Sequence, residues 1–289
     1  TDYIPQTNFL NGIFIPDVLY DFNNILRLTT SRMGAFEQES SNQAFELWSD
    51  GEYFDSYNNL KETFDAINSG AVTGNIEIKI DENSEETATA TLNASGTGSA
   101  SYSSVLIYPT KSLVSIVGNL DMPLINFNGA DNVTIDGRMN AEGTENSLFI
   151  TNMSTSSAAG TSTIRFINDA LYNKVQYCNL RGSSTATIGG IVLFHTGITT
   201  GNDNNIIENN KLTCASDNNR PVNVIYSSGS SASIVNNNIS VVNNFIYNFL
   251  NRRLESYGVN FGFSTSDCSV SGNHFYETTT FFPTEYVNY

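Results

Sequence analysis

The chain has 289 residues, of which 39% are hydrophobic and only 15% are charged. Asn, Ser, Thr and Gly supply much of the remainder, a composition that favours strands and turns over a helical protein. The formal net charge of −16 repels phosphate backbones and anionic lipids, which argues against nucleic-acid binding through a basic face. No apolar run reaches the length of about 18 residues that crosses a bilayer, so no membrane insertion is expected.

Residues 1–40 contain two short motifs that differ from the pattern of the remainder. Asp21-Phe-Asn-Asn-Ile-Leu-Arg27 is followed by Gly34-Ala-Phe-Glu37. The pair resembles the Asp-x-x-Gly-x-x-Arg and Gly-Ala-x-Glu signature at the C-terminal end of many secreted bacterial β-helix domains, with Asn24 in place of the usual Gly. The resemblance implies the tail of a preceding β-helix domain and makes the chain an interior fragment of a larger protein. An irregular N-terminal arm packed along the solenoid is the alternative.

Residues 41–57 are polar apart from one aromatic cluster, and we expect a linker there. Asp55 or Ser56 can cap a following helix, which is expected over residues 58–69 and ends at Gly70. The apolar residues of that segment recur at the spacing of a single helical stripe: Leu60, Phe64 and Ile67. Such a helix suits the first coil of a solenoid, because an uncovered end would expose the core and the strand edges.

Short apolar runs follow, separated by loops rich in Ser, Thr, Gly and Asn. Among them a six-residue pattern, apolar-x-x-Asn-x-apolar, returns every few dozen residues. Clear copies are Ile207–Leu212, Ile234–Ile239 and Val270–Phe275, and degenerate copies are Val133–Arg138 and Val175–Leu180. A repeat of this period indicates a solenoid.

The fourth position of this pattern would lie at the same corner of every coil. Asn tolerates left-handed backbone conformations, which suits a sharp corner between strands. Because stacked strands lie about 4.8 Å apart, side-chain amides on successive coils can hydrogen-bond to one another. We therefore predict a structural ladder that consists of Asp136, Cys178, Asn210, Asn237 and Asn273.

Residues 58–289 are accordingly predicted to be all-β, a right-handed parallel β-helix solenoid with an N-terminal capping helix. Phe64–Asn68, Thr73–Ile78 and Asn128–Gly137, together with the ladder copies, resemble the right-handed parallel β-helix (pectin-lyase-like) superfamily. More narrowly, they resemble large secreted surface proteins of Bacteroidota-type bacteria. The resemblance implies an extracellular or cell-surface location, export often through the type IX route, and a domain that continues beyond the fragment.

Catalysis on this fold would need particular side chains in one groove. Polysaccharide lyases of the fold generally use a Lys or Arg as base, beside a uronate carboxylate that Ca²⁺ on clustered Asp neutralises. The candidates are scattered singly along the chain: Arg165, Arg181, Lys211 and Arg220, with Asp131, Asp136, Asp169, Asp203 and Asp217. Glycoside hydrolysis needs two carboxylates about 5–10 Å apart, and the chain has no Asp-Asp pair. His195 and His274 are interpreted as a strand-end residue and a corner residue. No catalytic residue, metal site or cofactor is predicted, and Ca²⁺ alone is left open.

Aromatic residues are frequent for so polar a chain, with 18 Phe and 14 Tyr. Most are expected inside the coils, but four tyrosines could line an outward face that stacks on sugar rings: Tyr226, Tyr247, Tyr257 and Tyr276. The sequence thus favours a non-catalytic rigid stalk or adhesin module of a large exported protein. Its expected partner is a surface glycan or another cell-surface or secretion component. The alternative is a polysaccharide lyase or glycoside hydrolase with a divergent active site.

Overall fold

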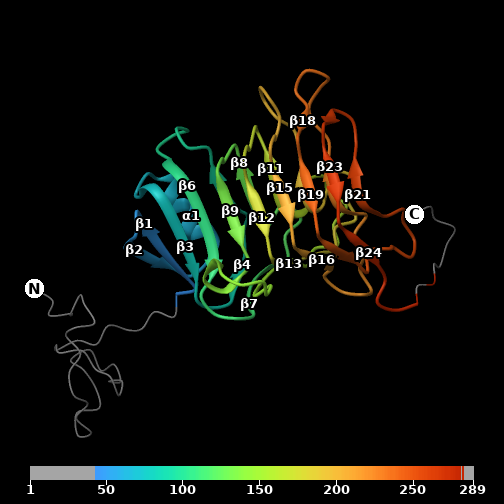
Figure 1. The fold of residues 1–289 in the computed structure, drawn as a ribbon, viewed down its shortest axis with the longest axis horizontal. Coiled ribbons are helices and arrows are strands. Elements are labelled where there is room, and N and C mark those ends of the chain that lie inside the picture. The colour runs from blue at the N-terminus through green and yellow to red at the C-terminus, as the bar shows by residue number, and fades with distance from the viewer. Residues whose placement is uncertain (1–42, 281, 283–289) are drawn as a thin grey trace, which may run out of the picture. The chain divides into compact units, whose positions relative to one another are not determined.

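The computed structural model describes residues 43–280 and 282, which form an all-β parallel solenoid of about six turns. A regular turn contributes one strand to each of three sheets, so the sheets are the three sides of the coil (Figure 1). Within these residues α1 (Leu60–Asn68) is the one α-helix. The predicted fold class is confirmed. The predicted tail of a preceding domain, residues 1–40, lies outside the described residues.

Neighbouring strands of each sheet come from successive turns of the chain. In spatial order, the first sheet contains β2 (Glu52–Tyr57), β1 (Phe45–Ser49), β3 (Thr73–Ile80), β6 (Ser101–Pro109), β9 (Val133–Asp136), β12 (Lys174–Gln176), β15 (Ile206–Glu208), β19 (Ser240–Val242) and β23 (Ser269–Ser271). The second contains β4 (Ser84–Glu86), β7 (Val114–Gly118), β10 (Leu148–Asn152), β13 (Cys178–Gly182), β16 (Lys211–Cys214), β20 (Phe245–Tyr247) and β24 (His274–Tyr276). The third contains β5 (Ala90–Asn93), β8 (Ile125–Asn128), β11 (Ser162–Ile167), β14 (Gly190–Phe194), β17 (Asn223–Ser227) and β21 (Tyr257–Phe261). A separate parallel pair joins β18 (Asn236–Asn237) to β22 (Thr265–Ser266), and η2 (Met139–Ala141) is a short 3₁₀ turn.

The core fills the inside of the coil with columns of like side chains. Successive residues of a strand point to opposite faces, so alternate positions enter the core. Parallel pairing then stacks each inward residue on its equivalent in the next turn. In the third sheet Phe127, Phe166 and Phe194 are fully buried, and their ring centroids are 5.2 and 4.7 Å apart in turn. Burial of such apolar surface, at about 25 cal/mol per Å², is the main force that holds the coils together.

The helix α1 closes the N-terminal end of the core. Its stripe of Leu60, Phe64 and Ile67 is fully buried, as the sequence pattern predicts. Asn59 is the N-cap, since its Oδ1 accepts from the Glu62 amide at 2.8 Å. This is a correction to the expectation that Asp55 or Ser56 would cap the helix: both precede the last residue of β2, so the chain is still extended at those positions.

The expected linker, residues 41–57, carries two strands instead. β1 and β2 form an antiparallel hairpin, and β1 also pairs with β3. Phe45 and Leu47 are fully buried in the core, whereas the residues of β2 are mostly exposed. The hairpin therefore extends the first sheet at its N-terminal edge, and the polar character of the segment reflects the solvent-facing strand.

An Asn ladder runs along the turn between the first and second sheets. The Asn210 Oδ1 accepts from the Cys178 amide at 2.9 Å. The Asn244 Oδ1 accepts from the backbone amide and the Nδ2 of Asn210, at 2.9 and 3.1 Å. The Asn273 Oδ1 does the same for Asn244, at 2.9 Å in each case. The left-handed residue at each corner is the one just before the ladder position: Tyr177, Asn209, Asn243 and Gly272.

Two residues of the predicted ladder lie elsewhere. Asn244 occupies the place that the sequence pattern assigned to Asn237, which is in β18 and donates its backbone amide to Asp203 at 2.8 Å. Val241–Ile246 carries the same six-residue pattern, so the signal is present in the sequence. Asp136 is two positions out of register, because Val175 pairs with Ile135; the Asp136 carboxylate binds Arg138 at 2.5 Å instead.

Candidate functional site

The loops that connect the second sheet to the third run along one corner of the described solenoid. They cover residues 153–161, 183–189, 215–222 and 248–256, and each follows one strand of the second sheet. Because those strands are consecutive and parallel, the four loops leave one corner of the coil one above the other. Their lengths and sequences differ, as expected where insertions collect at the corner of a stack.

These loops enclose a groove of two adjoining hollows, which we call the corner groove. A polar hollow of about 580 Å³ is lined by Thr155, Thr185, Asp217, Asn218, Asn219, Arg220, Asn251, Arg252, Arg253 and Leu254. A second hollow of about 530 Å³ is lined by Thr185, Thr187, Val222, Asn223, Tyr226, Leu254, Glu255, Tyr257, Asn260, Gly262 and Phe263. Both include Thr185 and Leu254, so the two hollows adjoin one another.

The second hollow is the aromatic half of the corner groove. It lies against β17 and β21, which supply Tyr226 and Tyr257, and Phe263 beyond β21 is 93% exposed. Asn223 is buried, and its Oδ1 accepts from the Asn260 Nδ2 at 3.0 Å. Aromatic faces beside oriented amides are the pairing that protein sites use for sugar rings and their hydroxyl groups.

The first hollow is the polar half, and it presents exposed cations on an acidic chain. Arg252 and Arg253 are exposed in the loop 248–256. That loop has internal order: the Asn251 Oδ1 accepts from the backbone amides of Arg253 and Leu254, at 3.0 and 3.2 Å. The Asn251 amide donates to the Ser256 hydroxyl at 2.9 Å. Negatively charged groups of a ligand would thus contact arginine side chains on an ordered turn.

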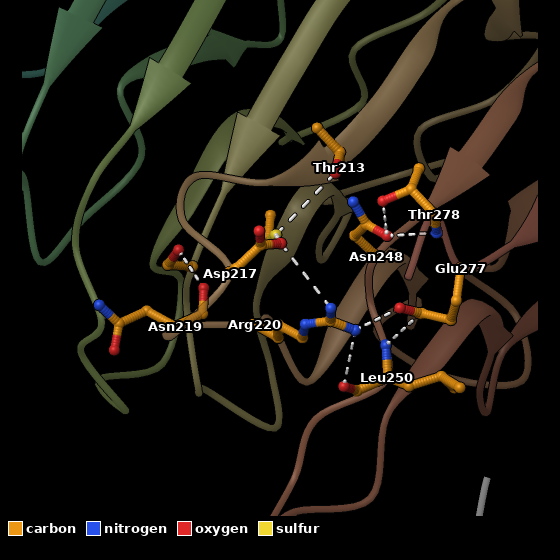
Figure 2. Close-up of polar contacts among 10 residues, drawn as sticks. Thr213, Asp217, Asn219, Arg220, Asn248, Leu250, Glu277 and Thr278 are labelled. Carbon is orange, nitrogen blue, oxygen red and sulfur yellow. Dashed lines mark hydrogen bonds and ion pairs between the residues drawn. The ribbon is translucent and has the colours of Figure 1, made fainter. Parts of the chain in front are cut away.

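Arg220 binds three successive coils together at the base of the polar half (Figure 2). Its side chain is 4% exposed, and its Nη1 donates to Glu277 and, at 3.3 Å, to the carbonyl of Leu250. Its Nη2 lies 3.7 Å from the Asp217 carboxylate, and its own carbonyl accepts from Asn251 at 2.6 Å. The second oxygen of Glu277 accepts from the Leu250 amide at 3.2 Å. We call Arg220 with Glu277 the clasp.

The structure separates the four candidate tyrosines into two pairs. Tyr226 and Tyr257 lie in the corner groove. Tyr247 and Tyr276 lie on the second sheet, where their rings stack at 5.2 Å with planes 12° apart. Since Tyr276 covers one face of Tyr247, that face is not available to a sugar ring. The two tyrosine pairs therefore do not make one binding surface.

The basic candidates for catalysis are equally dispersed. Lys211 and Arg181 are on β16 and β13 of the second sheet, and Arg181 lies over the ring of Phe149. Arg165, on the third sheet, donates from Nε to the Asn126 Oδ1 at 2.8 Å, and burial lowers its pKa. Arg220 is enclosed in the clasp. None of the first three lines the corner groove.

Most of the acidic candidates accept hydrogen bonds from backbone amides and do not face a common cavity. Asp131 accepts from the Leu171 amide at 2.7 Å, and burial raises its pKa. Asp169 binds backbone amides of the loop 197–201, among them those of Ile198 and Gly201 at 2.8 and 2.9 Å. Across residues 43–280 no three His, Cys, Asp or Glu side chains are grouped so as to hold a metal ion.

The two histidines lie at separate places. His195 follows β14, and its Nδ1 is 3.0 Å from the Thr196 hydroxyl. Burial, with a smaller effect of nearby Arg165, lowers its pKa. His274 stacks on Phe245 with ring centroids 5.1 Å apart. Neither ring lines the corner groove.

No protein-family model, curated protein or solved structure matches the chain. In the part of the chain that the structure describes, no helix has the length and apolar character needed to cross a membrane.

Proposed function

We propose that the chain is a non-catalytic, rigid β-solenoid module of a large exported cell-surface protein, and that its corner groove contacts a saccharide. The corner groove is the observation that carries the proposal, because four coils converge to build it. The superfamily resemblance of the sequence, including its likeness to surface proteins exported by the type IX route, supports the location.

The two halves of the groove suggest the kind of saccharide. Tyr226, Tyr257 and Phe263 offer aromatic surface, while Arg252 and Arg253 offer positive charge. A sugar chain that carries carboxylate or sulfate groups would satisfy both halves, since charge-assisted hydrogen bonds to Arg are short and strong. The surrounding negative charge of the chain would exclude acidic polymers elsewhere on its surface.

Calorimetric titration with a chondroitin sulfate oligosaccharide and with maltohexaose tests the proposal. We expect binding of the acidic sugar, weakened about tenfold by Y257A, since truncation of a tyrosine that anchors a partner costs about 1–2 kcal/mol. The double variant R252A/R253A should weaken acidic-sugar binding further at low salt than at high salt. Y276A, which changes a tyrosine of the second sheet, is the matched control. Equal effects of Y257A and Y276A would contradict a binding site in the corner groove.

The enzymatic alternative would use the same groove and is tested in the same samples. Asp217 and Glu255 are the acidic side chains that line it, one in each half. A glycoside hydrolase would release reducing ends and a lyase would create an unsaturated product that absorbs ultraviolet light. Either product, lost in D217N or E255Q, would replace the non-catalytic proposal with the alternative one.

A further inference from the structure

The clasp lies at the back of the corner groove and does not offer a free charge to a ligand. The Arg220 guanidinium is almost fully buried, and Glu277 is only 14% exposed. Their charges neutralise one another, and both members also bind backbone groups of the loop 248–256. A buried cation surrounded in this way holds neighbouring chain segments in place, because removing one partner leaves the other charge uncompensated.

The contacts of the clasp join segments that lie far apart along the chain. Arg220 and Glu277 are 57 residues apart, and between them lies the whole turn that carries Arg252 and Arg253. Both the amide and the carbonyl of Leu250 are bound, one by each member of the clasp. The loop 248–256 is therefore held from one side by its preceding coil and from the other by the following one.

We propose that Arg220 and Glu277 are positioning residues of the corner groove: they fix the loop 248–256 so that Arg252 and Arg253 face the ligand. Glu277 lines neither hollow, so this assigns a role in binding to a residue outside the groove. The proposal rests on the proposed function for its ligand, but the state of the loop can be measured without any ligand.

Trypsin reports directly on the loop, because it cleaves after Arg252 and Arg253. We expect E277Q and R220M each to speed cleavage at these two sites by about tenfold or more, the order by which loss of one charge-assisted hydrogen bond shifts a local opening equilibrium. Cleavage after Lys111, which is 56% exposed and remote in sequence, should keep its rate. The double variant R220M/E277Q should be no faster than the faster single variant, since the two residues act as one unit.

E208Q is the matched control. It removes the Lys174–Glu208 ion pair, which also joins two coils, at 3.0 Å, but lies on the first sheet. E208Q should leave cleavage at Arg252 and Arg253 unchanged. Unchanged cleavage in E277Q and R220M, or equal acceleration in E208Q, would overturn the assignment.

Binding of the chondroitin sulfate oligosaccharide completes the test. Positioning predicts weaker binding in E277Q together with faster cleavage after Arg252 and Arg253, while cleavage after Lys111 keeps its rate. Weaker binding with normal cleavage would mean that the pair contacts the sugar directly, which overturns a positioning role. If the unaltered chain binds neither sugar, the proposed function fails, while the cleavage rates still decide whether the clasp fixes the loop.

Discussion

Asn244 is the residue on which most bonds of the Asn ladder converge. It is fully buried, accepts two hydrogen bonds from Asn210, and donates to Asn273 and to the carbonyl of Ile207. N244A leaves buried donors without acceptors, and each costs about 1–3 kcal/mol. We expect a loss of about 3 kcal/mol in the free energy of unfolding, measured by urea denaturation.

N237A is the control for that substitution, since the same sequence pattern places its Asn at position 237. The side chain of Asn237 makes one long contact, with the Ser266 hydroxyl at 3.4 Å. We expect a change within about 0.5 kcal/mol. Equal losses in the two variants would show that the ladder adds no special stability.

Asp169 should make stability depend on acid pH. Burial alone would raise its pKa, but hydrogen bonds from the Thr199 hydroxyl and from the amides of residues 198, 199 and 201 outweigh it, so the pKa is lowered. The stabilisation is therefore complete above the unfolded pKa of about 3.9. It disappears as the pH falls through the lower folded value.

D169N tests this titration, because an amide cannot accept all of these bonds. We expect a loss of about 2 kcal/mol in the free energy of unfolding at neutral pH, and a smaller loss below about pH 3, measured by thermal unfolding across that range. A pH-independent effect of D169N would contradict the argument.

Asp131 should have the opposite effect on the pH dependence of stability, because burial raises its pKa. Its ionisation lowers the free energy of unfolding as the pH rises from the unfolded to the folded pKa, and D131N should remove this decrease.

At the scale of elements, α1 depends on a carboxylate from a strand. Glu86 of β4 accepts from the amides of Leu60 and Lys61, at 2.7 and 3.1 Å, and so occupies the helix N-terminus. Burial raises its pKa, partly offset by these same bonds. E86A leaves two amides without an acceptor, and we expect a loss of about 2 kcal/mol with faster hydrogen exchange in α1. E85A, which changes the adjacent exposed glutamate, should leave exchange in α1 unchanged.

The short turns between the first and second sheets can be predicted from the sequence, whereas the corner groove cannot. Each turn between the first and second sheets is short in its later copies, so its pattern of apolar and Asn residues survives in the sequence at a readable spacing. The sequence places Asp136 two positions out of register because Val133 and Ile135 both satisfy the first apolar position of the pattern. The turn from β9 to β10 is also longer than the later turns, so it has no apolar residue at the sixth position. Arg220 and Glu277, in contrast, meet only after two coils have stacked, and no local pattern relates them.

The linker expectation failed for a similar reason. Polar composition describes how much of a segment faces water, and a strand on the outside of a hairpin faces water along most of its length. Phe45 and Leu47 alternate as a buried strand would, but a strand of five residues is too short to separate that alternation from chance. Pairing with β3, a strand much further along the chain, decides the matter.

At the scale of the whole molecule, the two ends of the described solenoid differ. α1 covers the first coil, whereas Val270 and Phe275 of the last coil are 45% and 48% exposed, although the residues paired with them, Val241 and Ile246, are fully buried. We expect V241D to lower the free energy of unfolding by more than about 3 kcal/mol, because it buries an uncompensated charge. V270D should lower the free energy of unfolding by about 1 kcal/mol or less. Thermal unfolding of both variants measures the difference between the interior coil and the last coil. Equal costs would mean that the last coil is covered in solution.

The parallel pairing of successive turns also determines how the module would respond to force. Its inter-coil hydrogen bonds point along the solenoid axis. Tension on the two ends would therefore load and break the bonds of one coil at a time. Ladder positions repeat every 29 to 34 residues, so each released coil would lengthen the chain by about 10–11 nm. A pulling trace would then show a regular series of low steps, which would let the module yield gradually and dissipate load.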